Sequence, residues 1–105
     1  MNFGRSVDDV RDQLRNAQDH IQVIEAILVA ANDAHGVLDV VLLASGQPAA
    51  RRALEERYGL TEMQATAVLD LQVGRLNAVD VAEFERHRQE LVERAATLTA
   101  ELAAR

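Results

Sequence analysis

The stretch VRDQLRNAQDHIQVIEAILVAA, residues 10–31, places apolar residues in alternating steps of four and three. The series is Val10, Leu14, Ala17, Ile21, Ile24, Leu28 and Ala31. This heptad spacing predicts a long helix whose narrow apolar seam faces another helix. Ser6 with Asp9 resembles a capping box and predicts where the helix begins. We expect the helix to run to about Ala34, with Gly36 ending it.

The second half of this helix is apolar over a wider arc. Val23, Ile27 and Ala30 lie beside the seam there. A wider apolar arc needs more cover than a single helix provides. We therefore expect more than one neighbour to pack against the end of the helix.

We expect a second long helix from about Ala78 to Ala103, with Asn77 and Asp80 as its capping signal. This helix carries a matching apolar seam. The seam residues are Phe84, Leu91, Ala95, Leu98 and Leu102, with Arg88 in the remaining position. In an antiparallel arrangement the two seams face each other residue by residue, and the two residue numbers of every facing pair add up to the same value. The pairs are Val10 with Leu102, Leu14 with Leu98, Ala17 with Ala95, Ile21 with Leu91, Ile24 with Arg88, and Leu28 with Phe84. The two seams together predict a long antiparallel two-helix coiled coil.

Between the two long helices we expect three short ones, at about Val37–Ala44, Pro48–Arg57 and Glu62–Val73. Pro48 suits a first helical turn, and Thr61 suits an N-cap. The predicted fold is all-α, one module over residues 1–105. Its stalk helices cover about residues 6–34 and 78–104, and a small globular helical knob at the tip covers about residues 35–77.

Composition narrows the possible functions. The chain has 105 residues, a formal net charge of −6 and no cysteine, and all its cations are arginines. The acidic balance argues against autonomous DNA binding, and a solvated helix surface is the favoured interpretation of Arg51, Arg52 and Arg57. Neither a signal peptide nor a membrane-spanning stretch is recognised, so we expect a cytoplasmic protein without a membrane partner.

No motif in the chain predicts chemistry. His20, His35 and His87 lack the spacing of a metal site, although His35 and His87 are expected near the same end of the stalk. The chain contains neither a phosphate-binding glycine loop nor a nucleophile elbow. We therefore expect no catalytic residue, no metal site and no cofactor.

Two stretches resemble one family. ERYGLTEMQATAVLDLQVGRL, residues 56–76, is similar to the segment near the exit gate of bacterial type IIA topoisomerase A subunits, above all the A subunit of DNA gyrase. LRNAQDHIQVIEAILVAANDA, residues 14–34, resembles the preceding coil of that family. The matched positions of the first stretch are Gly59, Leu60, Thr61, Glu62, Gln64, Ala65, Ala67, Leu69, Asp70, Leu71, Arg75 and Leu76.

The resemblance implies a stalk with a knob, where two knobs meet across a two-fold axis and close the gate through which transported DNA leaves. The family's catalytic tyrosine lies in an upstream winged-helix domain that has no counterpart here. Tyr58 stands where the family has phenylalanine, which implies a packing residue and no nucleophile. Gly74 replaces a helix former beside the gate. We expect a diverged stand-alone copy of the module.

The segment GLTEMQATAVLDLQVGRL, residues 59–76, has two apolar stripes, one through Leu60 and Met63, the other through Ala65 and Leu69. Neighbouring helices could bury both stripes, or one could meet a partner. We favour the partner and expect a homodimer. The predicted interface comprises Leu60, Thr61, Met63, Gln64, Ala67, Leu71, Gly74 and Arg75.

The function predicted from these features is a non-catalytic homodimerisation module that contacts DNA at most indirectly. Two alternatives stay open. The chain could act as a regulator or decoy by pairing with a full-length gyrase A subunit, or it could supply one part of a split type IIA topoisomerase.

Overall fold

A computed structural model of the chain describes residues 6–71 and 77–104. Within these residues the chain forms five helices and no strand, which confirms the all-α prediction. The helices are α1 (Val7–Asn32), α2 (Ala34–Leu43), α3 (Gln47–Tyr58), α4 (Glu62–Asp70) and α5 (Ala78–Ala103). The molecule measures 56 × 28 × 18 Å. Its radius of gyration of 16.7 Å exceeds the roughly 13 Å of a compact chain of this length.

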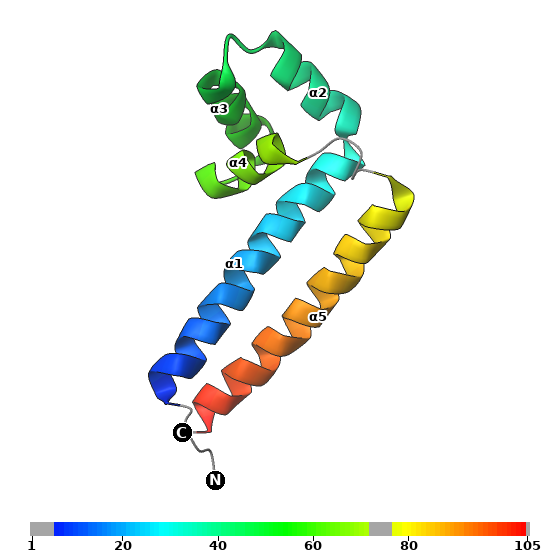
Figure 1. The fold of residues 1–105 in the computed structure, drawn as a ribbon. Coiled ribbons are helices and arrows are strands. Elements are labelled where there is room, and N and C mark those ends of the chain that lie inside the picture. Colours follow the sequence, from blue (N-terminus) through cyan, green and yellow to red (C-terminus); the bar gives the residue numbers. More distant parts are fainter. Residues whose placement is uncertain (1–5, 72–76, 105) are drawn as a thin grey trace.

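The helices are arranged in two regions (Figure 1). The long helices α1 and α5 lie side by side and antiparallel, and we call them the α1–α5 pair. The three short helices form the α2–α4 cluster at the end of the pair where α1 finishes. Both α2 and α4 pack against α1, and α3 packs against α2 and α4.

Local sequence signals explain most helix boundaries. Ser6 and Asp9 form the predicted capping box at the start of α1. Thr61 and Gln64 form another at the start of α4, and the Asn77 side chain accepts a hydrogen bond from the Asp80 amide at the start of α5. Gly59 ends α3 in the left-handed conformation at φ 66°, which a residue without a Cβ adopts freely.

Three predicted boundaries differ from the structure. The first helix ends at Asn32 instead of Ala34, because Asp33 leaves the helical conformation at φ −138°, ψ 53°. The second helix begins at Ala34 instead of about Val37, so that Gly36 does not end the first helix and lies buried inside α2. Helix α4 ends at Asp70, because Leu71 is extended at φ −69°, ψ 132°; the predicted end at Val73 lies outside the described residues.

Two apolar cores match the two regions. The core of the pair contains Ala17 and Ile24 of α1 and Leu91 of α5, with Ile21, Leu28, Phe84 and Ala95 packed against them. The core of the cluster contains Ala26, Ala30, Leu54, Ala65 and Val68, with Val37, Val40, Tyr58, Leu60 and Leu69 around them. The end of α1 thus contributes to the second core, as its wider apolar arc predicts.

Polar side chains link the two long helices across the seam. Arg88, at the non-apolar seam position, donates a hydrogen bond of 3.1 Å from Nη2 to Oε1 of Glu25. Arg94 donates one of 3.2 Å from Nη2 to Oε1 of Gln13. Arg94 follows Arg88 in α5, whereas its partner Gln13 precedes Glu25 in α1. This is the order of contacts between antiparallel helices.

None of the described helices alone is long and apolar enough to cross a membrane. Helices α1 and α2 meet the length and composition requirement of a membrane span only when taken together, and they are bent by 93° with respect to each other.

Candidate functional site

The exposed apolar surface of the cluster lies mainly on α2. The side chains of Leu38, Leu42 and Leu43 are 48%, 71% and 88% exposed. The opposite side of α2 packs inward through Val37 and Val40. In this ten-residue helix, Asp39 is the sole formally charged residue. Such a leucine-rich exposed face is typical of a surface that another molecule covers. We call Leu38, Leu42 and Leu43 the α2 face.

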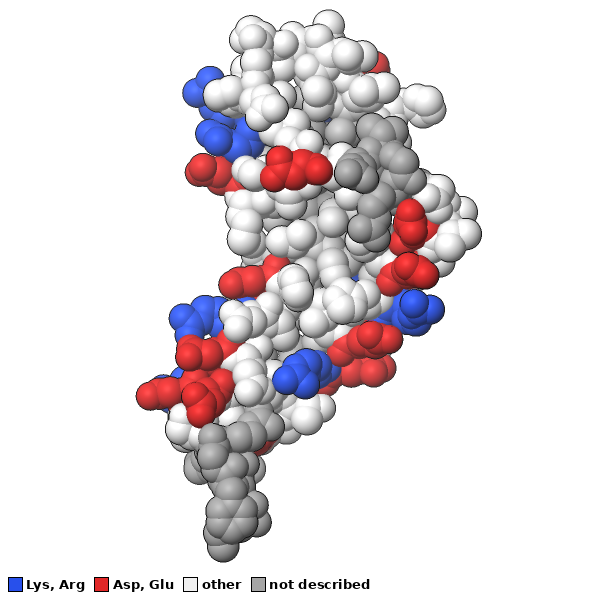
Figure 2. Space-filling model, in the orientation of Figure 1, with Lys and Arg blue, Asp and Glu red and all other residues white. Residues whose placement is uncertain are grey.

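Charge is distributed unevenly over the molecule (Figure 2). On the face shown, the end of the molecule that holds the cluster is mostly uncharged, whereas acidic and basic residues intermingle along the α1–α5 pair. A hollow of about 290 Å³ adjoins the α2 face. Its walls come from α1, α2 and α4 and include Ala30, Leu38, Val41 and Val68. An apolar hollow and an exposed leucine-rich helix face thus lie together at the cluster.

The interface predicted on α4 is only partly exposed. Met63 is 44% exposed, and Ala67 is half-buried. Leu60 packs against the core of the cluster, and Leu71 lines the hollow beside α2. The other predicted stripe is covered within the chain, since Ala65 is buried and Leu69 packs on the core. Gly74 and Arg75 lie outside the described residues.

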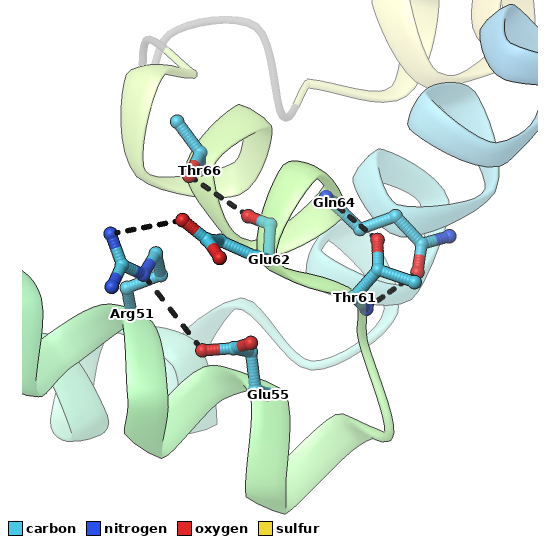
Figure 3. A network of polar contacts seen from close by, with 6 residues as sticks. All are labelled: Arg51, Glu55, Thr61, Glu62, Gln64 and Thr66. Atoms are coloured by element: carbon cyan, nitrogen blue, oxygen red, sulfur yellow. Dashed lines mark hydrogen bonds and ion pairs between the residues drawn. The ribbon is translucent and has the colours of Figure 1, made fainter.

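The polar residues of the predicted interface serve the fold. Thr61 Oγ1 accepts a hydrogen bond of 3.1 Å from the Gln64 amide, and Gln64 Oε1 accepts one of 3.0 Å from the Thr61 amide (Figure 3). Gln64 Nε2 also donates 2.8 Å to the backbone carbonyl of Gln22 on α1. The Gln64 side chain therefore caps α4 and ties it to α1.

An arginine of α3 lies between two carboxylates (Figure 3). Arg51 Nε is 3.8 Å from Glu55 on α3, and Arg51 Nη1 is 3.7 Å from Glu62 on α4. Its buried Nε has no hydrogen-bond partner. Arg57 also faces a carboxylate, with Nη2 3.7 Å from Oδ2 of Asp33. Arg51 and Arg57 are thus paired with carboxylates, and the buried Nε of Arg51 departs from the predicted solvated helix surface.

Tyr58 is engaged in a structural contact. Its hydroxyl donates a hydrogen bond of 2.7 Å to Oδ2 of Asp33. Burial, and secondly this hydrogen bond, raise the pKa of the Tyr58 phenol above its ordinary value. A raised pKa keeps the phenol protonated, which makes the oxygen a weaker nucleophile.

The structure brings together two of the three histidines. His87, in the third turn of α5, lies against His20 of α1, with ring centroids 6.1 Å apart and planes at 69°. His35 lies on α2 beside the hollow instead of at the end of α1. Among the described residues, no group of three or more His, Cys, Asp and Glu side chains could hold a metal ion.

Comparison with curated proteins adds one finding. The chain is 33% identical over 95 residues to the chloroplastic/mitochondrial DNA gyrase A subunit of Arabidopsis thaliana, covering 90% of this chain and 10% of that protein. The chain resembles one part of the A subunit of DNA gyrase. It is also 32% identical over 91 residues to the gyrase A subunit of Halalkalibacterium halodurans, and 32% identical over 78 residues to that of Mycoplasma pneumoniae.

These alignments cover 87% and 74% of this chain, but 11% and 9% of the respective gyrase subunits. The chain thus spans about a tenth of the length of the curated relatives it matches. No protein-family model matches the sequence. The resemblance predicted from residues 14–34 and 56–76 is therefore confirmed for a partial region of the gyrase A subunit.

Proposed function

We propose that the chain is a non-catalytic homodimerisation module of the kind that forms the exit gate of the gyrase A subunit. In this proposal the α1–α5 pair is an antiparallel coiled-coil stalk and the α2–α4 cluster is the knob. The observation that carries the proposal is the α2 face, which leaves three leucines exposed on a helix whose sole formally charged residue is Asp39.

Burial energetics favour a second copy over water on this face. Covering a leucine side chain contributes about 1.5–3 kcal/mol. A two-fold symmetric contact uses the same patch twice, so Leu38, Leu42 and Leu43 of both copies would be buried together. The α4 residues predicted from the sequence belong to the same proposal, with Met63 as their most exposed apolar side chain.

The α1–α5 pair suits a stalk. Its seam residues pack between the two helices, and its exposed surface carries charges of both signs. Such a surface stays solvated and places the cluster away from the start of α1 and the end of α5. DNA contact would then be indirect.

Sedimentation equilibrium tests the proposal. We expect the unaltered chain to be a dimer at about 100 µM, where an association of only about −5.5 kcal/mol is already detected. Leu42→Glu combined with Leu43→Glu should give a monomer with an unchanged helical circular dichroism spectrum, since both side chains are exposed. Val92→Glu, at an exposed valine of α5, is the matched control and should remain a dimer.

The result for Met63→Glu separates the two surfaces. If the contact lies on α4, this change alone breaks the dimer and the double α2 substitution does not. If it lies on α2, the reverse holds. A monomeric unaltered chain at that concentration contradicts the proposed function.

A heterotypic pairing is the second candidate, and the similarity to the gyrase A subunit over 90% of the chain favours it. A related knob on a full-length gyrase A subunit could present a similar surface to the α2 face. Two measurements test this candidate: co-purification of the tagged chain with the A subunit of the host gyrase, and the effect of the chain on supercoiling activity. Absence of both effects would exclude it.

A further inference from the structure

Asp33 lies at the bend between α1 and α2. Helices α1 and α2 meet at 93°, with Asp33 between them. The Asp33 amide donates 3.3 Å hydrogen bonds to the carbonyls of Val29 and Ala30 in α1. Its own carbonyl accepts a 3.0 Å hydrogen bond from the Val37 amide of α2. The backbone of Asp33 thus ends one helix and begins the next.

The side chain of Asp33 connects this bend to a third helix. Its Oδ2 atom accepts the 2.7 Å hydrogen bond from Tyr58 and lies 3.7 Å from Nη2 of Arg57. The Arg57 guanidinium in turn lies 5.6 Å from the centre of the Tyr58 ring. The last turn of α3 therefore holds the carboxylate with one hydrogen bond and one ion pair.

Gly36 makes room for the carboxylate. A Cβ at this buried position of α2 would lie 2.2 Å from Oδ2 of Asp33 and 2.8 Å from Oδ1. Glycine inside a helix costs about 1 kcal/mol relative to alanine. The sequence of α2 thus carries a poor helix former at a place where a methyl group would displace the Asp33 carboxylate.

We propose that Asp33 and Tyr58 are positioning residues that fix the direction of α2, and with it the α2 face, relative to the α1–α5 pair. The consequence of this positioning for dimerisation rests on the proposed function, whereas the orientation of α2 does not depend on it. A fixed α2 presents Leu38, Leu42 and Leu43 in one arrangement, so association does not have to order them.

Both side chains have the protonation state that this contact requires near neutral pH. The hydrogen bond from Tyr58, and to a smaller extent the Gly36 backbone amide and the charges of Arg57 and His35, lower the pKa of Asp33, while burial opposes them. The pKa of Tyr58 is raised. Asp33 therefore accepts as a carboxylate while Tyr58 donates as a phenol.

Distance measurements between spin labels test the orientation. Because the chain has no cysteine, single cysteines at the exposed positions Gln18 of α1 and Asp39 of α2 take the labels without further changes. Labelled protein is mixed with a large excess of unlabelled protein, so that only distances within one copy are read. Tyr58→Phe, which removes only the hydroxyl, should broaden the distance distribution.

A matched control removes a different hydroxyl. Thr66 donates a 2.8 Å hydrogen bond to the Glu62 carbonyl inside α4, so Thr66→Val links no two elements and should leave the distribution unchanged. Gly36→Ala displaces the carboxylate without altering Asp33 or Tyr58 and should reproduce the broadening. An unchanged distribution in both Tyr58→Phe and Gly36→Ala overturns the proposal.

The dimer dissociation constant is the second measurement. Tyr58→Phe should raise it about tenfold, the effect of losing one hydrogen bond to a charged group, with the circular dichroism spectrum unchanged. A broadened distribution with an unchanged dissociation constant overturns the link to dimerisation. If the unaltered chain proves monomeric, the proposed function fails, while the distance measurement still decides the role of Asp33 and Tyr58.

Discussion

The α1–α5 pair and the α2–α4 cluster differ in where their apolar residues go. In the pair, the apolar residues form one seam between two helices, and Arg88 and Arg94 bridge the helices by hydrogen bonds to α1. In the cluster, Leu54 and Val68 pack among the alanines Ala26, Ala30 and Ala65, while the leucines of the α2 face stay in solvent.

This difference indicates which region would use a partner under the proposed function. A seam between two helices is closed once the helices pair, and its charged exterior needs no further cover. Helix α2 of the cluster carries apolar side chains on both of its sides, but the core of the cluster covers only the side of Val37 and Val40. Substitutions in both regions can show which core is more tightly packed. They can also show how much the contact between α4 and α1 contributes to stability, and how the stability of the cluster changes with pH.

The largest expected effect is at Leu54, which is fully buried in the cluster. Leu54→Ala should lower the free energy of unfolding by about 3 kcal/mol, because the neighbouring alanines are too short to fill the cavity. Leu98→Ala in the pair should cost less, about 2 kcal/mol, since it lies near the end of α5 where the helices can adjust.

Urea unfolding at one fixed protein concentration measures both changes, since dimer stability depends on concentration. Leu42→Ala, at an exposed leucine, is the control for the cluster, measured at a concentration where the chain is monomeric. It should change the unfolding free energy by no more than about 0.5 kcal/mol. A greater loss for Leu98→Ala than for Leu54→Ala would contradict the idea that the cluster is the tighter core.

The next effect concerns the helix caps. Ser6→Ala, at the free end of the pair, should lower the unfolding free energy by about 1 kcal/mol. Thr61→Ala should cost more, about 1.5 kcal/mol, because it also frees the Gln64 side chain that donates to Gln22 on α1. Denaturant unfolding of the two variants side by side measures the difference. Equal losses would mean that the Gln64 contact contributes nothing to holding α4 on α1.

The sequence predicts the pair better than the cluster, and the physical reason is the number of neighbours. A seam needs only one partner, so the heptad spacing from Val10 to Leu28 is enough to identify it. In the cluster, each short helix meets several others, and a short apolar run such as residues 37–43 does not reveal which side is covered. The exposed α2 face therefore has no clear signal in the sequence, whereas the two stripes of residues 59–76 point to α4.

Gly36 shows why a local signal can mislead. Glycine usually breaks helices, so its position predicts the end of the first helix, but its role follows from the Asp33 carboxylate that lies against it. That carboxylate is held by Tyr58, 25 residues later in the chain. A contact over such a separation carries no periodic signal in the sequence.

A smaller effect of opposite sign is expected at Arg88. Arg88→Leu completes the apolar seam, and the side chain of Glu25 is exposed enough to remain solvated without its partner. An exposed ion pair contributes at most about 1 kcal/mol, so the added apolar burial should outweigh its loss and raise the unfolding free energy by about 0.5 kcal/mol. Thermal unfolding would show a higher midpoint. A lower midpoint would mean that the Arg88–Glu25 pair matters more to the two long helices than an uninterrupted seam.

The smallest effect is the pH dependence of the cluster, because the Asp33 side chain is 46% exposed and its interactions are screened. Its pKa is lowered in the folded chain, so its contribution is fully present above the unfolded value of about 3.9 and is lost as the pH falls through the folded value. The pKa of Tyr58 is raised, so its contribution is present below about 10 and is lost as the pH rises through the folded value.

Two variants separate the acid contribution of Asp33 from the alkaline contribution of Tyr58. The unfolding free energies of the unaltered chain, Asp33→Asn and Tyr58→Phe are measured across the pH range. The gap between the unaltered chain and Asp33→Asn should close on the acid side, and the gap to Tyr58→Phe should close on the alkaline side. Ser6→Ala serves as the control, because a change in the α1–α5 pair should leave the loss of unfolding free energy at alkaline pH unchanged. Curves that stay parallel at both extremes would show that the ionisation of Asp33 and Tyr58 does not affect the stability of the cluster.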